Sequence, residues 1–299
     1  MPSYAAMVEE CLGLLSNWTG EQAQMCTLTS AMTTGTLSFT VDQGDRLGIG
    51  LVEVDEELVY VASTDESSGT ASIPAWGRAQ RGSPAAAHAV GARVTTTPRY
   101  PRFSVKQKLA QAVAALYPDV PAVRLDESNT ADPARRQYPL PAGARRVLAA
   151  DWQAPVDPPQ WVPVTHWRLD TRADTTSFPT GVALAVADSM PAGQPLKVLY
   201  AGEPGLLAAG SDDFAAVTGY ADPVADLVVM AAAARLVVGP DLARVQTDTV
   251  EQSDRSATVP ASAAMTASRF LRQEYQARVD SERRRVAERY PARLHYEGV

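Results

Sequence analysis

Short apolar runs broken by turn residues, between residues 52 and 97, constrain the fold most. The first of them, VEVDEELVYV at residues 52–61, alternates apolar with polar residues around an acidic centre. Such valine-rich runs, bounded by turn residues, are typical of short antiparallel strands. We therefore predict a hairpin that turns at Asp55 and Glu56, within a β-meander at residues 26–102.

Apolar residues at helical spacing predict helices elsewhere in the chain. They cover residues 3–18, 104–117, 222–238 and 260–290. Each of these segments repeats apolar residues three or four positions apart, which places them on one side of a helix. Ser104 and Asp222 are good helix caps, because their side chains can accept a hydrogen bond from a free backbone amide at the helix start. Gly239 and Pro240 predict a helix end, with a further short helix at residues 241–250.

Between residues 123 and 201 the pattern changes to short apolar segments broken by proline and glycine. Several short strands with polar loops predict a β-sandwich or a small barrel. We interpret this region as an insertion between helices. The sequence thus predicts an α+β protein with a helical core of three main helices. Its parts are an N-terminal helix at 1–25, the β-meander at 26–102, the helical core at 103–122 and 202–299, and the inserted β-sandwich-like domain at 123–201.

Charge is unevenly distributed over a chain of net charge −7. Residues 1–75 contain eleven acidic residues and a single basic one, Arg46, whereas basic residues predominate in residues 76–150. Two interpretations are open. The acidic part of one copy could pair with the basic part of a neighbour in a ring. Alternatively, the two parts could pack against each other within one chain.

The densest group of carboxylates is Glu53, Asp55, Glu56 and Glu57 in the predicted hairpin. Alternation along a strand puts Glu53 and Asp55 on one face, which could suit a divalent cation. No asparagine, glycine or further acid completes a calcium-binding loop, so a solvated hairpin edge that hinders aggregation is the favoured interpretation. The four side chains are also candidates for an interface with a partner or a neighbouring subunit.

Residues that carry common catalytic chemistry are scarce. The three histidines, His88, His166 and His295, lack metal-binding spacing, and Cys11 and Cys26 are the only cysteines. Glycine-rich phosphate loops, zinc-protease motifs and serine-hydrolase motifs are missing from the sequence. We therefore predict a protein that is not an enzyme and binds no cofactor or metal. His88 is expected to make a structural hydrogen bond.

The sequence does not predict a membrane or secreted protein. Its longest apolar run, at residues 227–238, is interrupted by Arg235 and is too short to span a bilayer. Glu9 and Glu10 lie where a secretion signal would carry positive charge.

The last predicted helix is rich in arginine. Its candidates for a partner or intersubunit interface are Arg272, Arg278, Arg283, Arg284, Arg285 and Arg289. Arginines can contact DNA phosphates or an acidic protein surface. Interleaved acids such as Glu274, four residues before Arg278, can pair within the helix. That interleaving favours a partner protein or a second subunit over a dedicated DNA-binding surface.

Three motifs resemble head-to-tail adaptor (connector) proteins of long-tailed actinobacterial bacteriophages. One is the hairpin together with RGSPAAAHAVGARV at residues 81–94. Another is FSVKQKLAQAVAALYP at residues 103–118, and the third is RVAERYP at residues 285–291.

The resemblance implies a structural virion protein at the head–tail junction, made in the host cytoplasm. It implies a homo-oligomeric ring of about twelve copies below the portal protein. Its other neighbours would be a tail-side stopper or terminator protein, and genomic DNA would pass through the channel without sequence-specific binding. On this hypothesis the three helices form an adaptor-type core that builds the ring, while the β-regions face outward or towards the tail. No membrane or cofactor is implied.

Two other functions stay open. The first motif also occurs in other tail components, which makes a minor tail or baseplate structural protein an alternative. The second is a carbohydrate-binding accessory protein, in which Trp152, Trp161 and Trp167 would form a sugar-binding platform. Aromatic residues in a β-sandwich more often belong to its core, which favours the structural function.

Overall fold

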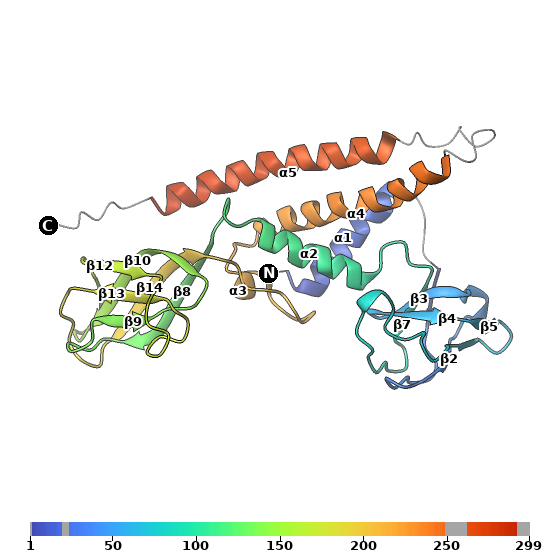
Figure 1. Cartoon of the computed structure of the whole chain (residues 1–299), viewed down its shortest axis with the longest axis horizontal. Coiled ribbons are helices and arrows are strands. Elements are labelled where there is room, and N and C mark those ends of the chain that lie inside the picture. Colours follow the sequence, from blue (N-terminus) through green and yellow to red (C-terminus); the bar gives the residue numbers. More distant parts are fainter. Residues whose placement is uncertain (1, 20–23, 249–261, 292–299) are drawn as a thin grey trace. The chain divides into compact units, whose positions relative to one another are not determined.

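The computed structural model describes residues 2–19, 24–248 and 262–291 (Figure 1). The chain divides into two units. The first comprises residues 1–5, 110–228 and 270–299, and the second comprises residues 6–109 and 229–269. Four helices cross the boundaries between these units, and each unit is described by itself below.

Within the described ranges the fold is α+β and rich in strands, with fourteen strands in four antiparallel sheets and five helices. The prediction of a helical core with three main helices is therefore wrong. Helical periodicity in residues 222–290 overstates how much the helices contribute to the buried core, because the side chains of the last helix are largely exposed. Strand residues, by contrast, supply most of the buried apolar side chains in two clusters of the described ranges.

The second unit contains a β-module of two small sheets. One sheet has the order β1 (Gln24–Thr27), β7 (Arg93–Thr96), β3 (Gly50–Val54) and β4 (Glu57–Val61), and the other has the order β2 (Ser38–Thr40), β6 (Thr70–Ser72) and β5 (Ser63–Asp65). Two 3-10 turns lie between strands, η1 (Gly44–Arg46) and η2 (Gln80–Gly82). Phe39, Val52 and Val94 belong to one buried cluster that both sheets share. Burial of each such side chain contributes about 1.5–3 kcal/mol.

The predicted hairpin is present as β3 and β4. Val54 lies opposite Glu57, so the strands are joined by Asp55 and Glu56 alone. Asp55 has a φ of 52°, a left-handed conformation that two-residue hairpin turns require and that aspartate tolerates better than most residues. The turn fixes the register and thereby sets where each carboxylate of the hairpin points.

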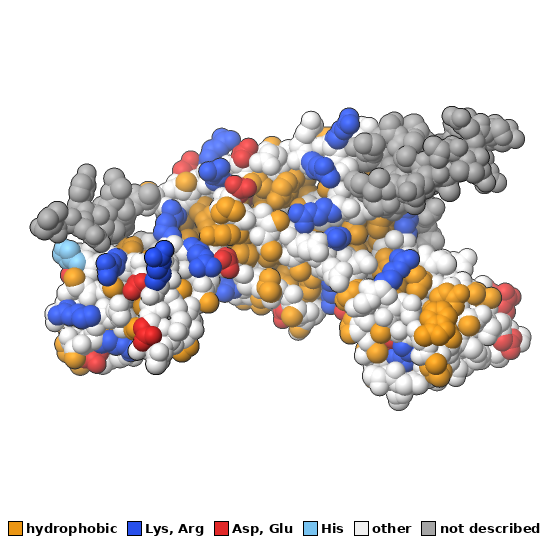
Figure 2. Space-filling view, viewed as in Figure 1, with side chains coloured by type: hydrophobic (Ala, Val, Ile, Leu, Met, Phe, Trp, Pro, Cys, Tyr) orange, Lys and Arg blue, Asp and Glu red, His pale blue; other side chains and the backbone are white. Residues whose placement is uncertain are grey.

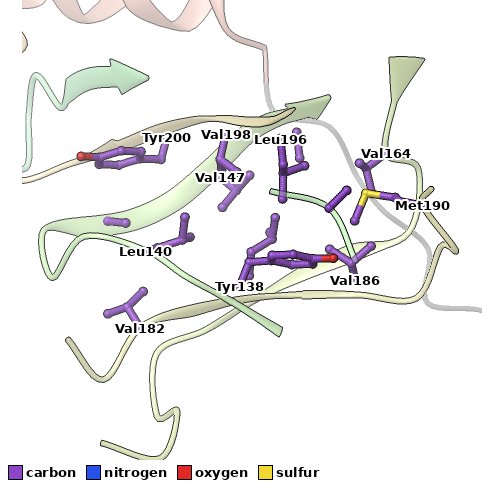
Figure 3. Close-up of a cluster of buried hydrophobic side chains, with 14 residues drawn as sticks. Tyr138, Leu140, Val147, Val164, Val182, Val186, Met190, Leu196, Val198 and Tyr200 are labelled. Atoms are coloured by element: carbon purple, nitrogen blue, oxygen red, sulfur yellow. The ribbon is translucent and has the colours of Figure 1, made fainter. Parts of the chain in front are cut away.

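The first unit contains a seven-stranded β-region. Its larger sheet has the order β11 (Gln160–Pro163), β10 (Ala144–Ala154), β14 (Pro195–Gly202) and β8 (Ala122–Thr130), and the smaller has β12 (Trp167–Asp170), β13 (Ala183–Val186) and β9 (Gln137–Pro139). Tyr138 of the smaller sheet belongs to the same buried cluster as Leu196 and Val198 of the larger one (Figure 3). Side chains of both sheets thus form one core.

The helices are α1 (Tyr4–Thr19), α2 (Arg102–Ala115), α3 (Phe214–Thr218), α4 (Val224–Asp248) and α5 (Ser262–Arg289). The expected helix end at Gly239 and Pro240 is wrong, because α4 continues through them and includes residues 241–248 of the segment predicted as a separate short helix. Residues 249 and 250 of that segment lie outside the described residues. Proline removes only one hydrogen bond and has a helical φ, so a helix can continue past it. α4 and α5 touch through Ser268, whose hydroxyl donates to the Ala234 carbonyl at 3.3 Å.

Candidate functional site

The carboxylate cluster of the hairpin centres on Glu57, which is buried. Arg78 binds both of its oxygens, from Nε at 2.7 Å and from Nη2 at 2.8 Å. The backbone amides of Ala79 and Ala86 donate to the same carboxylate. Burial raises the pKa of Glu57, but the hydrogen bonds from Arg78, Ala86, His88 and Ala79 outweigh it and lower the pKa to about 2. Glu57 is therefore a structural anion that ties the hairpin to residues 78–88.

His88 lies between two carboxylates of this cluster. Its Nδ1 is 2.8 Å from Asp55 and its Nε2 is 3.0 Å from Glu57. Both contacts are hydrogen bonds to ionised carboxylates only when both ring nitrogens carry hydrogen. The backbone of His88 also pairs with Met32 in both directions, at 2.8 Å each. These contacts fit the expected structural hydrogen bond.

Glu53 faces away from this cluster, towards the start of α2. Its carboxylate accepts a hydrogen bond from the backbone amide of Arg102, the first residue of the helix. Burial is the main reason why the pKa of Glu53 is raised to about 7, despite the opposing contributions of Arg102 and Phe103. A carboxylate at this position binds unpaired amides and complements the positive end of the helix dipole. Glu53 thus attaches α2 to β3.

Salt bridges within the second unit join some acidic residues of positions 1–75 to basic residues that follow them in the chain. Glu9 of α1 binds Arg102 and lies 3.6 Å from Arg93, and Glu56 binds Lys106 of α2. Hydrogen bonding to Arg102 is the main cause of the lowered pKa of Glu9. For these residues the structure shows pairing within one chain, which was one of the two open interpretations.

The four acidic interface candidates therefore have different environments. Glu53 and Glu57 are buried, so a partner could not reach their carboxylates, whereas Asp55 and Glu56 are about half exposed. Glu53 and Asp55 bind different groups and share no cation site. No group of three or more His, Cys, Asp or Glu suits a metal ion in the part of the chain that the structure describes. His166 is exposed and binds Asp188 at 2.7 Å, while His295 lies outside the described residues.

The arginines of α5 divide into two rows. Leu271 and Val279 define its buried side. At 100° per residue, Arg278, Arg285 and Arg289 lie on one flank of that side. All three have contacts within the chain. Arg278 binds Glu274 at 3.0 Å and lies 3.9 Å from Asp226, Arg285 binds Glu282 at 2.6 Å, and Arg289 lies over the Tyr290 ring.

Arg272 and Arg283 lie on the opposite flank, and Arg284 lies further towards solvent. All three are exposed, and none has a salt bridge to any residue that the structure describes. Figure 2 shows basic side chains spread along this helix. The sequence analysis treats all six arginines as one set of interface candidates. The structure separates a row that has partners from Arg272, Arg283 and Arg284, which have no salt bridge to a described residue.

The three tryptophans of the sugar-platform alternative do not converge. Trp152 lies opposite Val162 and packs against the core, whereas Trp161 lies opposite Gln153 and so points to the other face of the sheet. Trp161 is covered by Lys197, whose Nζ is 4.1 Å from the ring centre. Trp167 belongs to the other sheet and also packs against the core.

An exposed aromatic pair in the second unit was not singled out by the sequence. Trp76 is 63% exposed, and its ring lies 4.8 Å from the ring of Tyr60. The two residues are sixteen positions apart, so spacing alone could not show that they are neighbours.

Comparison of the chain with models of protein families, with curated proteins and with solved structures gives no match. Each described helix is too short or too polar to cross a membrane.

Proposed function

We propose that this protein is a structural virion protein, the head-to-tail adaptor of a long-tailed actinobacterial bacteriophage. In this proposal a homo-oligomeric ring binds below the portal protein and extends the channel through which genomic DNA leaves. The ring contacts a tail-side stopper or terminator protein and has no catalytic role. Support comes from the three sequence motifs and from the unpaired arginines of α5.

The observation that carries the proposal is the exposed flank of α5. The helix has 28 residues and is therefore about 42 Å long. Arg278 and Arg285 pair with glutamates of the same helix, whereas Arg272, Arg283 and Arg284 have no salt bridge to a described residue and are left for another surface. Complementary charge at the rim of an interface orients partners and raises the rate of association. A neighbouring subunit or an acidic surface of the portal protein fits this role.

Charge reversal on this flank tests the proposal. We expect the full chain to sediment as a ring, and the double variant R272E/R283E to sediment as smaller species at the same concentration. R168E is the matched control, because Arg168 is an exposed arginine on β12, away from α5. If R272E/R283E forms the ring as well as the unchanged chain does, this flank of α5 is not part of the interface. A chain that stays monomeric at all concentrations, with or without portal protein, would contradict the ring itself.

A minor tail or baseplate structural protein is the second candidate. The strand-rich architecture favours it, because the helical core that the adaptor hypothesis assumed is not formed. Purification of virion parts distinguishes the two candidates. An adaptor remains with portal-bearing capsids, whereas a tail component remains with isolated tails.

A further inference from the structure

An outer strand of the larger sheet has an open edge. β8 pairs with β14 on one side, and no other described strand lies beside it. The amide of Val123 turns away from β14 and donates to the Gly219 carbonyl at 3.1 Å. Amides along an antiparallel strand point alternately to its two sides. The amide and carbonyl of Leu125, two residues further on, therefore point to the open side as well.

A groove of about 320 Å³ adjoins this edge. Leu125 and Leu199 line it from the sheet, Tyr220 lines it from the segment after α3, and Val286 and Tyr290 line it from the end of α5. The Leu125 side chain is 53% exposed, which is unusual for a leucine beside other apolar groups. An open edge beside an apolar groove is the arrangement by which proteins bind an extended peptide as an added strand.

Positive charge borders the groove. Arg285 and Arg289 of α5 line it, and of these only Arg285 has a salt bridge, to Glu282, within the described ranges. Arg124 of β8 lines an adjoining hollow, and its buried Nε has no hydrogen-bond partner in the described structure. Because the Arg124 Nε is buried, the carboxylate of a bound segment would instead meet the exposed guanidinium groups of Arg285 and Arg289.

We propose that this edge and groove bind an extended, acidic segment of a different protein. The segment pairs with the backbone of Leu125, places alternate apolar side chains in the groove and directs a carboxylate to the arginines. Backbone pairing supplies affinity, and the apolar and charged contacts supply selectivity. The proposal goes beyond the ring function, because it assigns a partner site that Arg272, Arg283 and Arg284 do not line.

Peptide binding to the full chain tests the site. The probe is a fluorescein-labelled heptapeptide in which valine alternates with threonine and each end carries aspartate. We expect saturable binding in fluorescence anisotropy. A peptide methylated on every internal amide cannot pair with the strand and is expected to bind at least about tenfold more weakly. A peptide with lysine at both ends is expected to bind several-fold more weakly. Equal binding of the methylated peptide, or no binding by the probe, overturns the proposal.

Variants at Leu125 give a second test. Leu125→Pro removes the open-side amide without removing a bond to β14, and Leu125→Ala is the matched control that retains the amide. We expect the proline variant to bind the probe at least about tenfold more weakly than the alanine variant. Thermal unfolding shows whether the proline variant is folded. If it is not, the test is the binding of the methylated peptide to the unchanged chain. Self-association that only Leu125→Pro abolishes would assign the edge to a second copy and overturn the proposal.

Failure of ring formation alone would contradict the adaptor function and leave peptide binding unaffected.

Discussion

At the scale of single residues, the carboxylates of the β3–β4 hairpin stabilise the fold through hydrogen bonds and salt bridges. Glu57 is the clearest case, because Arg78, His88 and two backbone amides share its carboxylate. We expect Glu57→Ala to lower the free energy of unfolding by about 3 kcal/mol or more, since it leaves the Arg78 guanidinium buried without its partner. Urea unfolding measures this, with the exposed Glu66→Ala as control. A loss no greater than in the control would show that the cluster is not structural.

Glu53 and Glu57 give opposite pH dependences of stability. The pKa of Glu57 falls from 4.5 to about 2 on folding, so its stabilisation is present above pH 4.5 and is lost as the pH falls towards 2. The pKa of Glu53 rises from 4.5 to about 7, so its contribution is present below pH 4.5 and is lost as the pH rises through 7.

The variant Glu53→Gln separates the two effects, because glutamine can still accept the Arg102 amide but does not ionise. Relative to the unchanged chain, we expect Glu53→Gln to become progressively more stable between pH 4.5 and pH 7. Urea unfolding at a series of pH values measures the difference. A constant difference across this range would mean that the pKa of Glu53 is not raised.

At the scale of elements, few side chains of α5 pack against the rest of the chain. Leu271 and Val279 are its buried apolar anchors in the first unit, and Arg278 adds an exposed salt bridge to Asp226 of α4 at 3.9 Å. We expect Val279→Asp to release the helix, because an unpaired carboxylate would be buried. Hydrogen exchange should then become faster in α5 while the strands β10 and β14 stay protected. Arg283→Ala, on the exposed flank, should leave exchange unchanged. Equal protection of α5 in both variants would contradict the packing described here.

Sequence patterns predicted some elements and missed others for physical reasons. The hairpin at Asp55 was predictable because alternation and turn residues are local signals. The partners of Glu57 were not, since Arg78 and His88 lie 21 and 31 residues away and meet it only after the module folds. The split of the α5 arginines depends on which side is buried, which Val279 shows only in the structure. Three-residue strands such as β9 are too short to display any period.

At the scale of the whole chain, the charges of the hairpin have partners within the chain, while Arg272, Arg283 and Arg284 of α5 have no salt bridge to a described residue. The hairpin carboxylates therefore do not need a neighbouring copy to neutralise them. Any contact with another subunit must use surfaces that folding leaves open. In this account those surfaces are Arg272, Arg283 and Arg284, together with the open edge at Leu125.

The most direct test of the adaptor proposal is electron microscopy of the full chain mixed with the portal protein of the same phage. The account predicts rings of this protein stacked coaxially on one end of the portal ring, with α5 at contacts between subunits or with the portal. Particles that show the portal ring alone, with this protein still monomeric in solution, would contradict it.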